Sequence, residues 1–287
     1  MVERANINMK ILVFGKNGQV GSKLNKLQNI ISVSREEVNF LDTEKAVNLI
    51  DAYKPSAVIN AVAKTNVDLC EIEKSESEII NTITPIEIAK RCKLKNIPFI
   101  HISTDYVFDG KKNSPYKEND LPNPLNYYGL TKLNAEKGIE NLDFNSVILR
   151  TSWIFSESKK NFIHKIINQV KNNKNIKVVN DQIGSPTSAD DIANVCLTII
   201  KYLNNKKKLK KIYHYSGYPI TNFYEYAKEI IYKSNNIYSI HSAKTSELSY
   251  EALRPKYSYL NCDLIVNDLG ICRPNWKESL SKIFINK

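Results

Sequence analysis

The chain has 287 residues, of which 42% are hydrophobic and 25% charged, a balance typical of a soluble globular protein. This length is enough for one large domain, or for one domain with a smaller lobe. No apolar run approaches the roughly eighteen residues of a membrane span, and residues 1–8 lack the apolar core of a signal peptide. We therefore expect a cytoplasmic protein that does not bind a membrane.

The formal net charge of +11 raises the question of a nucleic-acid partner. However, the lysines are spread along the chain, and the densest run, over residues 206–211, lies in a predicted loop. A solvated basic surface is the favoured interpretation, with nucleic-acid binding as the weaker alternative. The five cysteines and four histidines show neither a Cys-x-x-Cys pair nor metal-ligand spacing, which predicts free thiols and no metal site within the chain.

The first predicted elements are a strand over residues 10–14, a glycine-rich turn and a helix that includes residues 22–27. Strand, glycine turn and helix are the context that a dinucleotide-binding fingerprint requires. The glycines follow the spacing Gly-x-x-Gly-x-x-Gly. We expect Gly15 to permit the tight turn, Gly18 to let backbone N–H groups approach a pyrophosphate, and Gly21 to bring helix and strand close together.

The second predicted strand, over residues 30–34, ends without the acidic residue that binds the adenosine 2′-hydroxyl of NAD. Arg35 follows it directly, and a guanidinium forms charge-assisted pairs with a 2′-phosphate. This favours NADPH. Arg35 as a loop cation beside Glu36 and Glu37 is the alternative, and it leaves NADH open.

Further helices are predicted over residues 43–53 and 76–94, and further strands over residues 57–63 and 98–103. Alternating helices and strands with short connections predict a doubly wound, mostly parallel α/β sheet. In such sheets, ligands bind beyond the carboxyl ends of the strands. We therefore expect the functional side chains directly after each strand.

Two stretches after the fourth predicted strand carry chemistry. Hydroxyl groups at residues 103–104 follow that strand, and a Tyr-x-x-x-Lys spacing stands further along at Tyr128 and Lys132. On a helix, residues four apart share one face, so the ammonium of Lys132 would stabilise the phenolate of Tyr128 and lower the pKa of the phenol. The pattern predicts Tyr128 as a general acid; two exposed helix residues are the alternative.

The sequence resembles the extended short-chain dehydrogenase/reductase superfamily, and within it the dTDP-4-dehydrorhamnose reductase family. Beyond the glycine loop and Tyr-x-x-x-Lys, the resemblance is carried by stretches along nearly the whole chain, namely residues 60–68, 103–110, 150–155, 181–187, 212–217 and 254–258. It implies a Rossmann domain over residues 9–153, to which 176–203 return, and a smaller substrate-binding lobe in most of 154–287.

The resemblance also implies site residues. The catalytic set would be Thr104, Tyr128 and Lys132. The coenzyme would contact Gly18, Gln19, Val20, Asn39, Phe40, Ala63, Lys64 and Thr65, although Lys64 departs from the usual Tyr or His and Asn39 from the usual Asp. The sugar nucleotide would contact Thr104, Asp105, Tyr106 and Trp153.

Alternatives stay open at several of these positions. Trp153 is also consistent with a core aromatic residue. Arg254 is a candidate for the nucleotide diphosphate, or a structural turn residue before Pro255. Related 4,6-dehydratases carry an Asp-Glu pair where this chain has Asp105 and Tyr106, so reduction is favoured over elimination of water.

The implied function is NADPH- or NADH-dependent reduction of a nucleotide-linked 4-keto-6-deoxysugar, a cytoplasmic step toward surface polysaccharide. The alternative is a coenzyme-binding regulatory subunit similar to that of methionine adenosyltransferase. A homodimer is expected, and Mg²⁺ is a candidate cofactor that the sequence pattern does not place.

Overall fold

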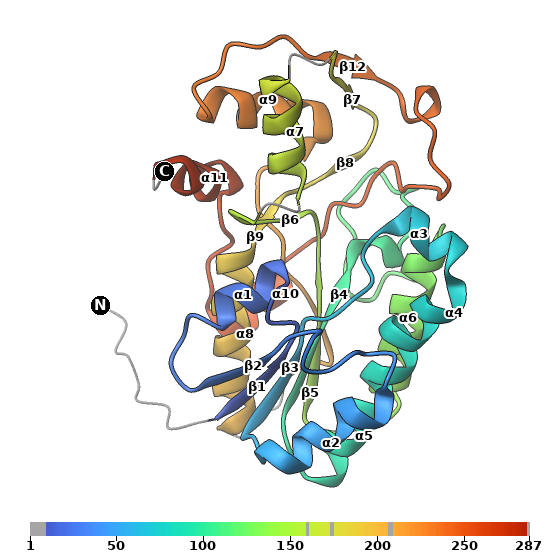
Figure 1. The fold of residues 1–287 in the computed structure, drawn as a ribbon, viewed down its shortest axis with the longest axis vertical. Helices are drawn as coiled ribbons and strands as arrows, with labels where there is room; N and C mark the ends of the chain where they lie inside the picture. The colour runs from blue at the N-terminus through green and yellow to red at the C-terminus, as the bar shows by residue number, and fades with distance from the viewer. Residues whose placement is uncertain (1–9, 159–160, 173–174, 206–208, 286–287) are drawn as a thin grey trace.

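In the computed structural model, which describes residues 10–158, 161–172, 175–205 and 209–285, a parallel sheet is covered by helices on both faces and carries a smaller lobe at one end (Figure 1). The six strands lie in the order β10–β5–β4–β3–β1–β2, and every neighbouring pair is parallel. This confirms the predicted doubly wound α/β sheet. The strands are β1 (Ile11–Phe14), β2 (Ile30–Val33), β3 (Ala57–Asn60), β4 (Phe99–Thr104), β5 (Ser146–Thr151) and β10 (Ile212–His214).

The strands are mostly apolar because both faces of the sheet are buried, although β4 and β5 also carry buried polar side chains such as His101 and Arg150. Along β1, Ile11 and Val13 pack into one core cluster, whereas Leu12 and Phe14 pack into a second cluster on the opposite face. The helices that cover the first face are α1 (Gln19–Leu24), α8 (Ala189–Asn204) and α10 (Asp263–Leu269). Those that cover the second face are α2 (Thr43–Tyr53), α5 (Thr84–Leu94) and α6 (Tyr127–Glu140).

One connection on the second face is longer and mostly helical. After β3 the chain forms α3 (Val67–Ile72), α4 (Lys74–Glu78) and a π-helical turn, η1 (Ile79–Ile83), which continues into α5. After β4 a short 3₁₀ turn, η2 (Asp105–Val107), leads into the loop before α6. These segments bring α3, η1 and η2 against α6.

The lobe has its own apolar core, formed by residues of α7 (Phe162–Lys171), α9 (Phe223–Lys233) and α11 (Trp276–Ile285). It also contains a parallel pair of strands, β7 (Lys177–Val179) and β12 (His241–Ala243), with a 3₁₀ turn, η3 (Thr245–Glu247), after β12. Two small pairs, β6 (Ile154–Phe155) with β9 (Thr187–Ser188) and β8 (Ile183–Gly184) with β11 (Thr221–Asn222), lie between the sheet and the lobe (Figure 1).

The core contacts divide the chain differently from the predicted ranges. Ile176 and Val178 belong to the core of the lobe, not to that of the main domain. The return to the main domain begins at α8 and is completed by β10 and α10. The division into functional domains stays a prediction.

The predicted extension over residues 1–8 and the first three lysines of the basic run at 206–211 lie outside the described residues. In the part of the chain that the structure describes, no helix combines the length and the apolar character needed to cross a bilayer.

Candidate active site

The glycine turn between β1 and α1 has the close backbone packing that its spacing predicts. Gly15 adopts a φ of 103°, a conformation that side chains disfavour. A Cβ atom on Gly21 would lie 2.0 Å from the carbonyl oxygen of Gly15, so any side chain there would force helix and turn apart. The turn therefore depends on glycine at both positions.

A cavity of about 270 Å³ opens beside this turn at the carboxyl ends of the strands. It brings together seven of the predicted site residues: Gly18, Gln19, Val20, Ala63, Thr65, Tyr128 and Lys132. Seven further lining residues were not predicted as site residues: Asn17, Ala61, Val62, Ile102, Ser103, Ile154 and Ser158. We call this space the coenzyme cleft.

Some of these seven residues could have been predicted from their positions in the sequence, and others could not. Ala61, Val62 and Ser103 lie at or after strand ends, where the rule for parallel sheets points. Ile154 and Ser158 reach the cleft from beyond β5, more than 130 positions after the glycine turn. Ile154 lies in the stretch over residues 150–155 that carries the family resemblance, whereas no local pattern in the sequence marks Ser158.

The side chain of Gln19 ties the glycine turn to this distant segment. Its amide nitrogen donates to the carbonyl oxygen of Ile154 at 2.9 Å, and its oxygen accepts from Ser156 and Asn161, each at 3.0 Å. Gln19 thus has a structural role in addition to its place in the lining of the cleft.

Four predicted coenzyme contacts do not line the cleft. Arg35 is exposed after β2, and the Asn39 side chain accepts from the backbone N–H of Leu41 at 3.1 Å. Phe40 is buried against Phe14, with ring centroids 5.4 Å apart.

The fourth is Lys64. Its ammonium forms ion pairs with Glu73 and Glu76, and its backbone N–H donates to the Asn81 side chain at 2.8 Å. Its side chain is therefore engaged at the surface of α4 and is not directed into the cleft.

Helix α6 holds the predicted acid and its lysine. The helix begins where the Asn126 side chain accepts from the backbone N–H of Gly129 at 2.8 Å, an N-cap contact that satisfies a free donor. A Cβ on Gly129 would lie only 2.2 Å from the carbonyl oxygen of Tyr106. Glycine therefore lets α6 approach η2 and places Tyr128 beside the end of β4.

The electrostatics of Tyr128 and Lys132 differ from the expectation. Burial raises the pKa of the Tyr128 phenol, and only the Thr104 hydroxyl opposes this. The Lys132 nitrogen donates to the carbonyl oxygen of Ile102 at 2.8 Å and lies 2.9 Å from Nε2 of His101. Burial lowers the pKa of Lys132 to about 7. The predicted lowering of the Tyr128 pKa by Lys132 is thus absent from this structure, because the lysine nitrogen is directed toward β4.

Thr104 and Asp105 lie next to Tyr128. The Thr104 hydroxyl donates to the Asp105 carboxylate at 3.1 Å and accepts from the backbone N–H of Tyr106 at 3.1 Å. Asp105 is 2% exposed, and its second oxygen, Oδ2, lies within hydrogen-bond geometry of no partner among the described residues, although the Ser258 hydroxyl is close enough to oppose the effect of burial on its pKa. Burial raises the pKa of this carboxyl group to about 7.

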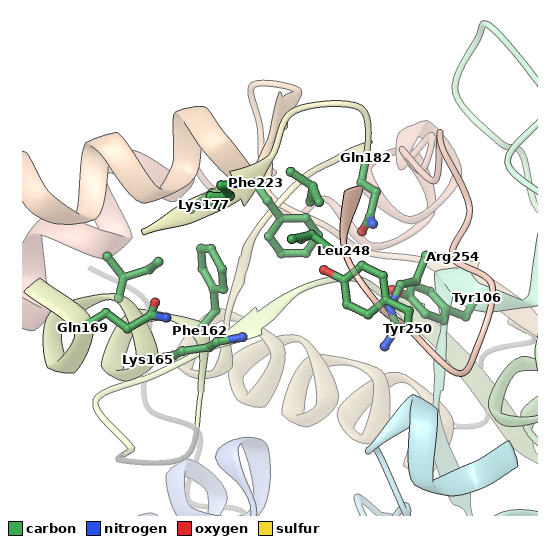
Figure 2. Close-up of a pocket in the computed structure, with 13 residues that line it drawn as sticks. Tyr106, Phe162, Lys165, Gln169, Lys177, Gln182, Phe223, Leu248, Tyr250 and Arg254 are labelled. Atoms are coloured by element: carbon green, nitrogen blue, oxygen red, sulfur yellow. The ribbon is translucent and has the colours of Figure 1, made fainter. Parts of the chain in front are cut away.

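A second cavity, of about 190 Å³, lies between the main domain and the lobe, and we call it the lobe cavity (Figure 2). Aromatic rings, cationic groups and amides face it together. The labelled side chains in Figure 2 are Tyr106, Phe162, Lys165, Gln169, Lys177, Gln182, Phe223, Leu248, Tyr250 and Arg254. Of these, Tyr106 and Arg254 were predicted to contact a sugar nucleotide.

Arg254 is held in a specific position at this cavity. Its guanidinium donates to both carboxylate oxygens of Asp68, at 2.9 and 2.7 Å, and lies over the ring of Tyr250 at 4.1 Å. Trp153 does not line either cavity. It stacks on Phe223, which does, with ring centroids 3.8 Å apart.

The two cavities meet at a pair of tyrosines. Tyr106 lines the lobe cavity and Tyr128 lines the coenzyme cleft, and their rings form an edge contact with centroids 5.9 Å apart. Two ligands, one in each cavity, would therefore both come close to Tyr128.

Comparison with known proteins shows the family to which the chain belongs. The family model described as "RmlD substrate binding domain" matches residues 9–287. The chain belongs to this family. Its members include the dTDP-4-dehydrorhamnose reductase of Aggregatibacter actinomycetemcomitans, to which the chain is 33% identical over 96% of its length and 98% of the relative's. A spore coat polysaccharide biosynthesis protein of Bacillus subtilis is 32% identical over 94% of the chain and 95% of that protein.

Solved structures show the same relationship. A dTDP-4-dehydrorhamnose reductase from Bacillus anthracis, crystallised in complex with NADP, superposes with a TM-score of 0.91 at 29% identity, covering 97% of this chain and 99% of that one. An orthologue from Clostridium acetobutylicum gives 0.90 at 34% identity, with the same coverage.

Proposed function

We propose that the protein reduces the 4-keto group of a nucleotide-linked 6-deoxysugar with NADPH or NADH. The substrate we assign is dTDP-4-dehydro-L-rhamnose, and the product is dTDP-L-rhamnose for surface polysaccharide. The observation that carries this proposal is the position of Tyr128, which lines the coenzyme cleft and contacts Tyr106 of the lobe cavity. An acid at that junction can donate a proton during a reaction between a coenzyme in one cavity and a sugar in the other.

The bound nicotinamide coenzyme supplies the hydride, and the protein supplies position and a proton. The phenol of Tyr128 donates that proton to the oxygen that becomes an alkoxide. Because burial raises its pKa, Tyr128 is in the protonated form that a general acid requires. The Thr104 hydroxyl, beside Tyr128, helps to orient the same oxygen.

The lobe cavity has the chemistry of a nucleotide-sugar site. The rings of Phe162 and Phe223 offer surfaces for a base, and the amide of Gln182 can select its hydrogen-bonding edge. Lys165, Lys177 and Arg254 supply positive charge for a diphosphate. We assign the sugar to the Tyr106 end, nearest Tyr128.

For the coenzyme, the exposed Arg35 supports binding of a 2′-phosphate, and we propose a preference for NADPH. We propose that the coenzyme contacts only the backbone, and not the side chains, of Asn39, Phe40 and Lys64. Among the described residues, no group of three or more His, Cys, Asp or Glu side chains is arranged to hold a metal. We therefore assign none of the described residues to Mg²⁺. The homodimer and the cytoplasmic location stay predictions.

The alternative of a coenzyme-binding regulatory subunit is not favoured. The similarity to reductases extends along nearly the whole chain, and Thr104, Tyr128 and Lys132 are present together. A regulatory subunit needs the coenzyme cleft but has no use for an acid at its junction with a second cavity.

The proposal is tested by following coenzyme oxidation with several nucleotide-linked 4-keto-sugars, each with NADPH and with NADH. We expect oxidation in step with sugar reduction, fastest with dTDP-4-dehydro-L-rhamnose and NADPH. A protein that binds coenzyme but oxidises neither form with any of these sugars would contradict the proposal.

A further inference from the structure

A buried chain of hydrogen bonds lies behind Lys132, between the ends of β3 and β4. The Lys132 nitrogen is 2.9 Å from Nε2 of His101, and Nδ1 of His101 is 3.2 Å from the amide nitrogen of Asn60. All three side chains are at most 1% exposed. They must therefore satisfy one another's hydrogen-bonding capacity.

The orientation of the Asn60 amide is fixed by the backbone. The N–H of Val62 donates to Oδ1 of Asn60 at 3.0 Å, and a backbone N–H can only donate. This contact identifies the carbonyl oxygen of the amide, so the group facing His101 is its NH₂. An NH₂ group also only donates. Nδ1 of His101 is therefore the acceptor.

This contact sets the tautomer of His101. Burial, the largest effect, holds the pKa of His101 well below its usual range, so the ring is neutral. A neutral imidazole has one donor and one acceptor nitrogen. Since Nδ1 accepts from Asn60, the proton is on Nε2 and points at Lys132. An ammonium has no lone pair to receive it, whereas a neutral amine has one.

We propose that Asn60 and His101 hold Lys132 as a neutral amine in the coenzyme-free protein, which makes His101 a positioning residue of the active site. The catalytic meaning of this inference rests on the proposed function. The amine accepts from His101 and donates to the carbonyl oxygen of Ile102, which directs its nitrogen toward β4. The phenol of Tyr128 therefore meets no lysine cation before the coenzyme binds.

The charged groups around Lys132 are consistent with this assignment. Glu136, one turn further along α6, favours the ammonium. However, its carboxylate is paired with Arg150 of β5 at 2.6 Å and accepts from the Ser103 hydroxyl of β4. The nearest contributions from β3 and β4, Asn60 and His101, are uncharged. Burial is the largest effect and lowers the pKa of Lys132 to about 7.

Proton uptake on coenzyme binding follows from this assignment. A nicotinamide coenzyme is anionic, and in the cleft that Lys132 lines its negative charge would favour the ammonium form of the lysine. Calorimetry of coenzyme binding at pH 8, in buffers of different ionisation enthalpy, should show uptake of a proton that is absent from Lys132→Met. Binding without uptake in the parent protein would contradict the proposal.

The tautomer is tested directly by ¹⁵N NMR of the histidine rings in the coenzyme-free parent protein, with the His101 signals assigned by their loss in His101→Gln. We expect a protonated Nε2 and an unprotonated Nδ1. The reverse tautomer would overturn the proposal, and this measurement requires no variant other than the one used for assignment.

Asn60→Asp provides a second, near-isosteric test. Its new oxygen would accept from Nδ1, so Nε2 would become the acceptor and Lys132 would donate to it as an ammonium. We expect the tautomer to reverse and the acid dissociation constant of Lys132, followed through its ¹³Cε signal, to fall at least tenfold. An unchanged tautomer and titration in folded Asn60→Asp would contradict the proposal. Because neither readout depends on turnover, failure of the reductase assay and failure of this inference are distinguishable.

Discussion

Asp105 is a buried acidic residue of the active-site region. Its carboxyl group is buried, accepts from Thr104, and leaves Oδ2 without a partner among the described residues. Desolvation disfavours the ionised form, and burial raises the pKa of this group from 3.8 to about 7 in the folded protein. The unfolded chain, in contrast, ionises at the ordinary value.

This difference predicts a loss of stability with rising pH. Between the unfolded and folded pKa values, the unfolded state releases the proton first, so folding becomes less favourable as pH rises toward 7. For the buried Asp105 carboxyl group, this difference in pKa corresponds to about 4 kcal/mol of unfolding free energy by pH 8. Asp105→Asn has no ionisation at this position. Urea unfolding at pH 5 and pH 8 should show the parent losing stability relative to the variant, and parallel behaviour of the two would contradict the assignment.

At the residue scale, the sequence pattern predicts which groups react but not their protonation states. The spacing of Tyr128 and Lys132 is local and could be predicted from helix geometry. The contact of Lys132 with His101 crosses from α6 to β4. Which of the two nitrogens donates depends on Asn60, the last residue of β3, and on the backbone N–H of Val62 two residues later. No sequence pattern encodes such a tautomer.

At the scale of elements, the spacing between α6 and η2 determines where Tyr128 lies. A Cβ on Gly129 would meet the backbone of Tyr106 at 2.2 Å, and backbone atoms cannot move aside without displacing the turn. Gly138 lies on the same helix, and a Cβ there would meet side-chain atoms of Ile86 and no backbone, namely Cδ1 at 2.3 Å and Cγ1 at 2.7 Å. The two glycines therefore form a matched pair.

Gly129→Ala should displace Tyr128 and lower turnover by at least tenfold, with a loss of about 1–3 kcal/mol of stability from overpacking. Gly138→Ala should keep turnover, since a rotation of Ile86 relieves the contact and alanine favours the helix by roughly 1 kcal/mol. Steady-state kinetics and urea unfolding measure both effects. Equal turnover in the two variants would show that the spacing of α6 and η2 is not what positions the acid.

Most elements of the sheet could be predicted from the sequence because the strands are short, largely apolar runs. The sequence did not predict where the chain returns from the lobe to the main domain. Residues 176–179 have the composition of a core strand, but β7 pairs with β12 in the lobe, a contact between segments more than 60 positions apart. Composition cannot distinguish one buried parallel pair from another.

At the scale of the whole molecule, an ion pair joins the main domain to the segment that borders the lobe cavity. Arg254 and Asp68 are 186 positions apart, and their bidentate contact holds Arg254 at the cavity beside Tyr250. The guanidinium lowers the pKa of Asp68, so the carboxylate stays ionised at neutral pH. The pair is partly exposed, which limits its contribution to stability to about 1 kcal/mol.

Two substitutions separate the roles of this pair. Arg254→Ala removes both the tether and the charge offered to a diphosphate, and we expect the KM for the nucleotide sugar to rise at least tenfold. Asp68→Asn keeps the charge of Arg254 and should raise KM much less. Coenzyme affinity, measured by fluorescence titration, should be unchanged in both variants. Equal increases in KM would make Arg254 a purely structural residue.

The position of Tyr128 at the junction of the two cavities is the central claim, and its neighbour offers a control. Tyr127 is also a helix residue, but its hydroxyl contacts Glu78 at 3.3 Å and it lines neither cavity. Removing its hydroxyl leaves the junction intact.

The most direct test compares coenzyme oxidation by Tyr128→Phe and Tyr127→Phe with dTDP-4-dehydro-L-rhamnose, alongside coenzyme binding by each. Removal of a general acid costs roughly 10²–10⁴-fold in rate. We predict that loss for Tyr128→Phe, with coenzyme binding retained, and turnover within a few-fold of the parent for Tyr127→Phe. Turnover by Tyr128→Phe equal to that of the parent would contradict the account.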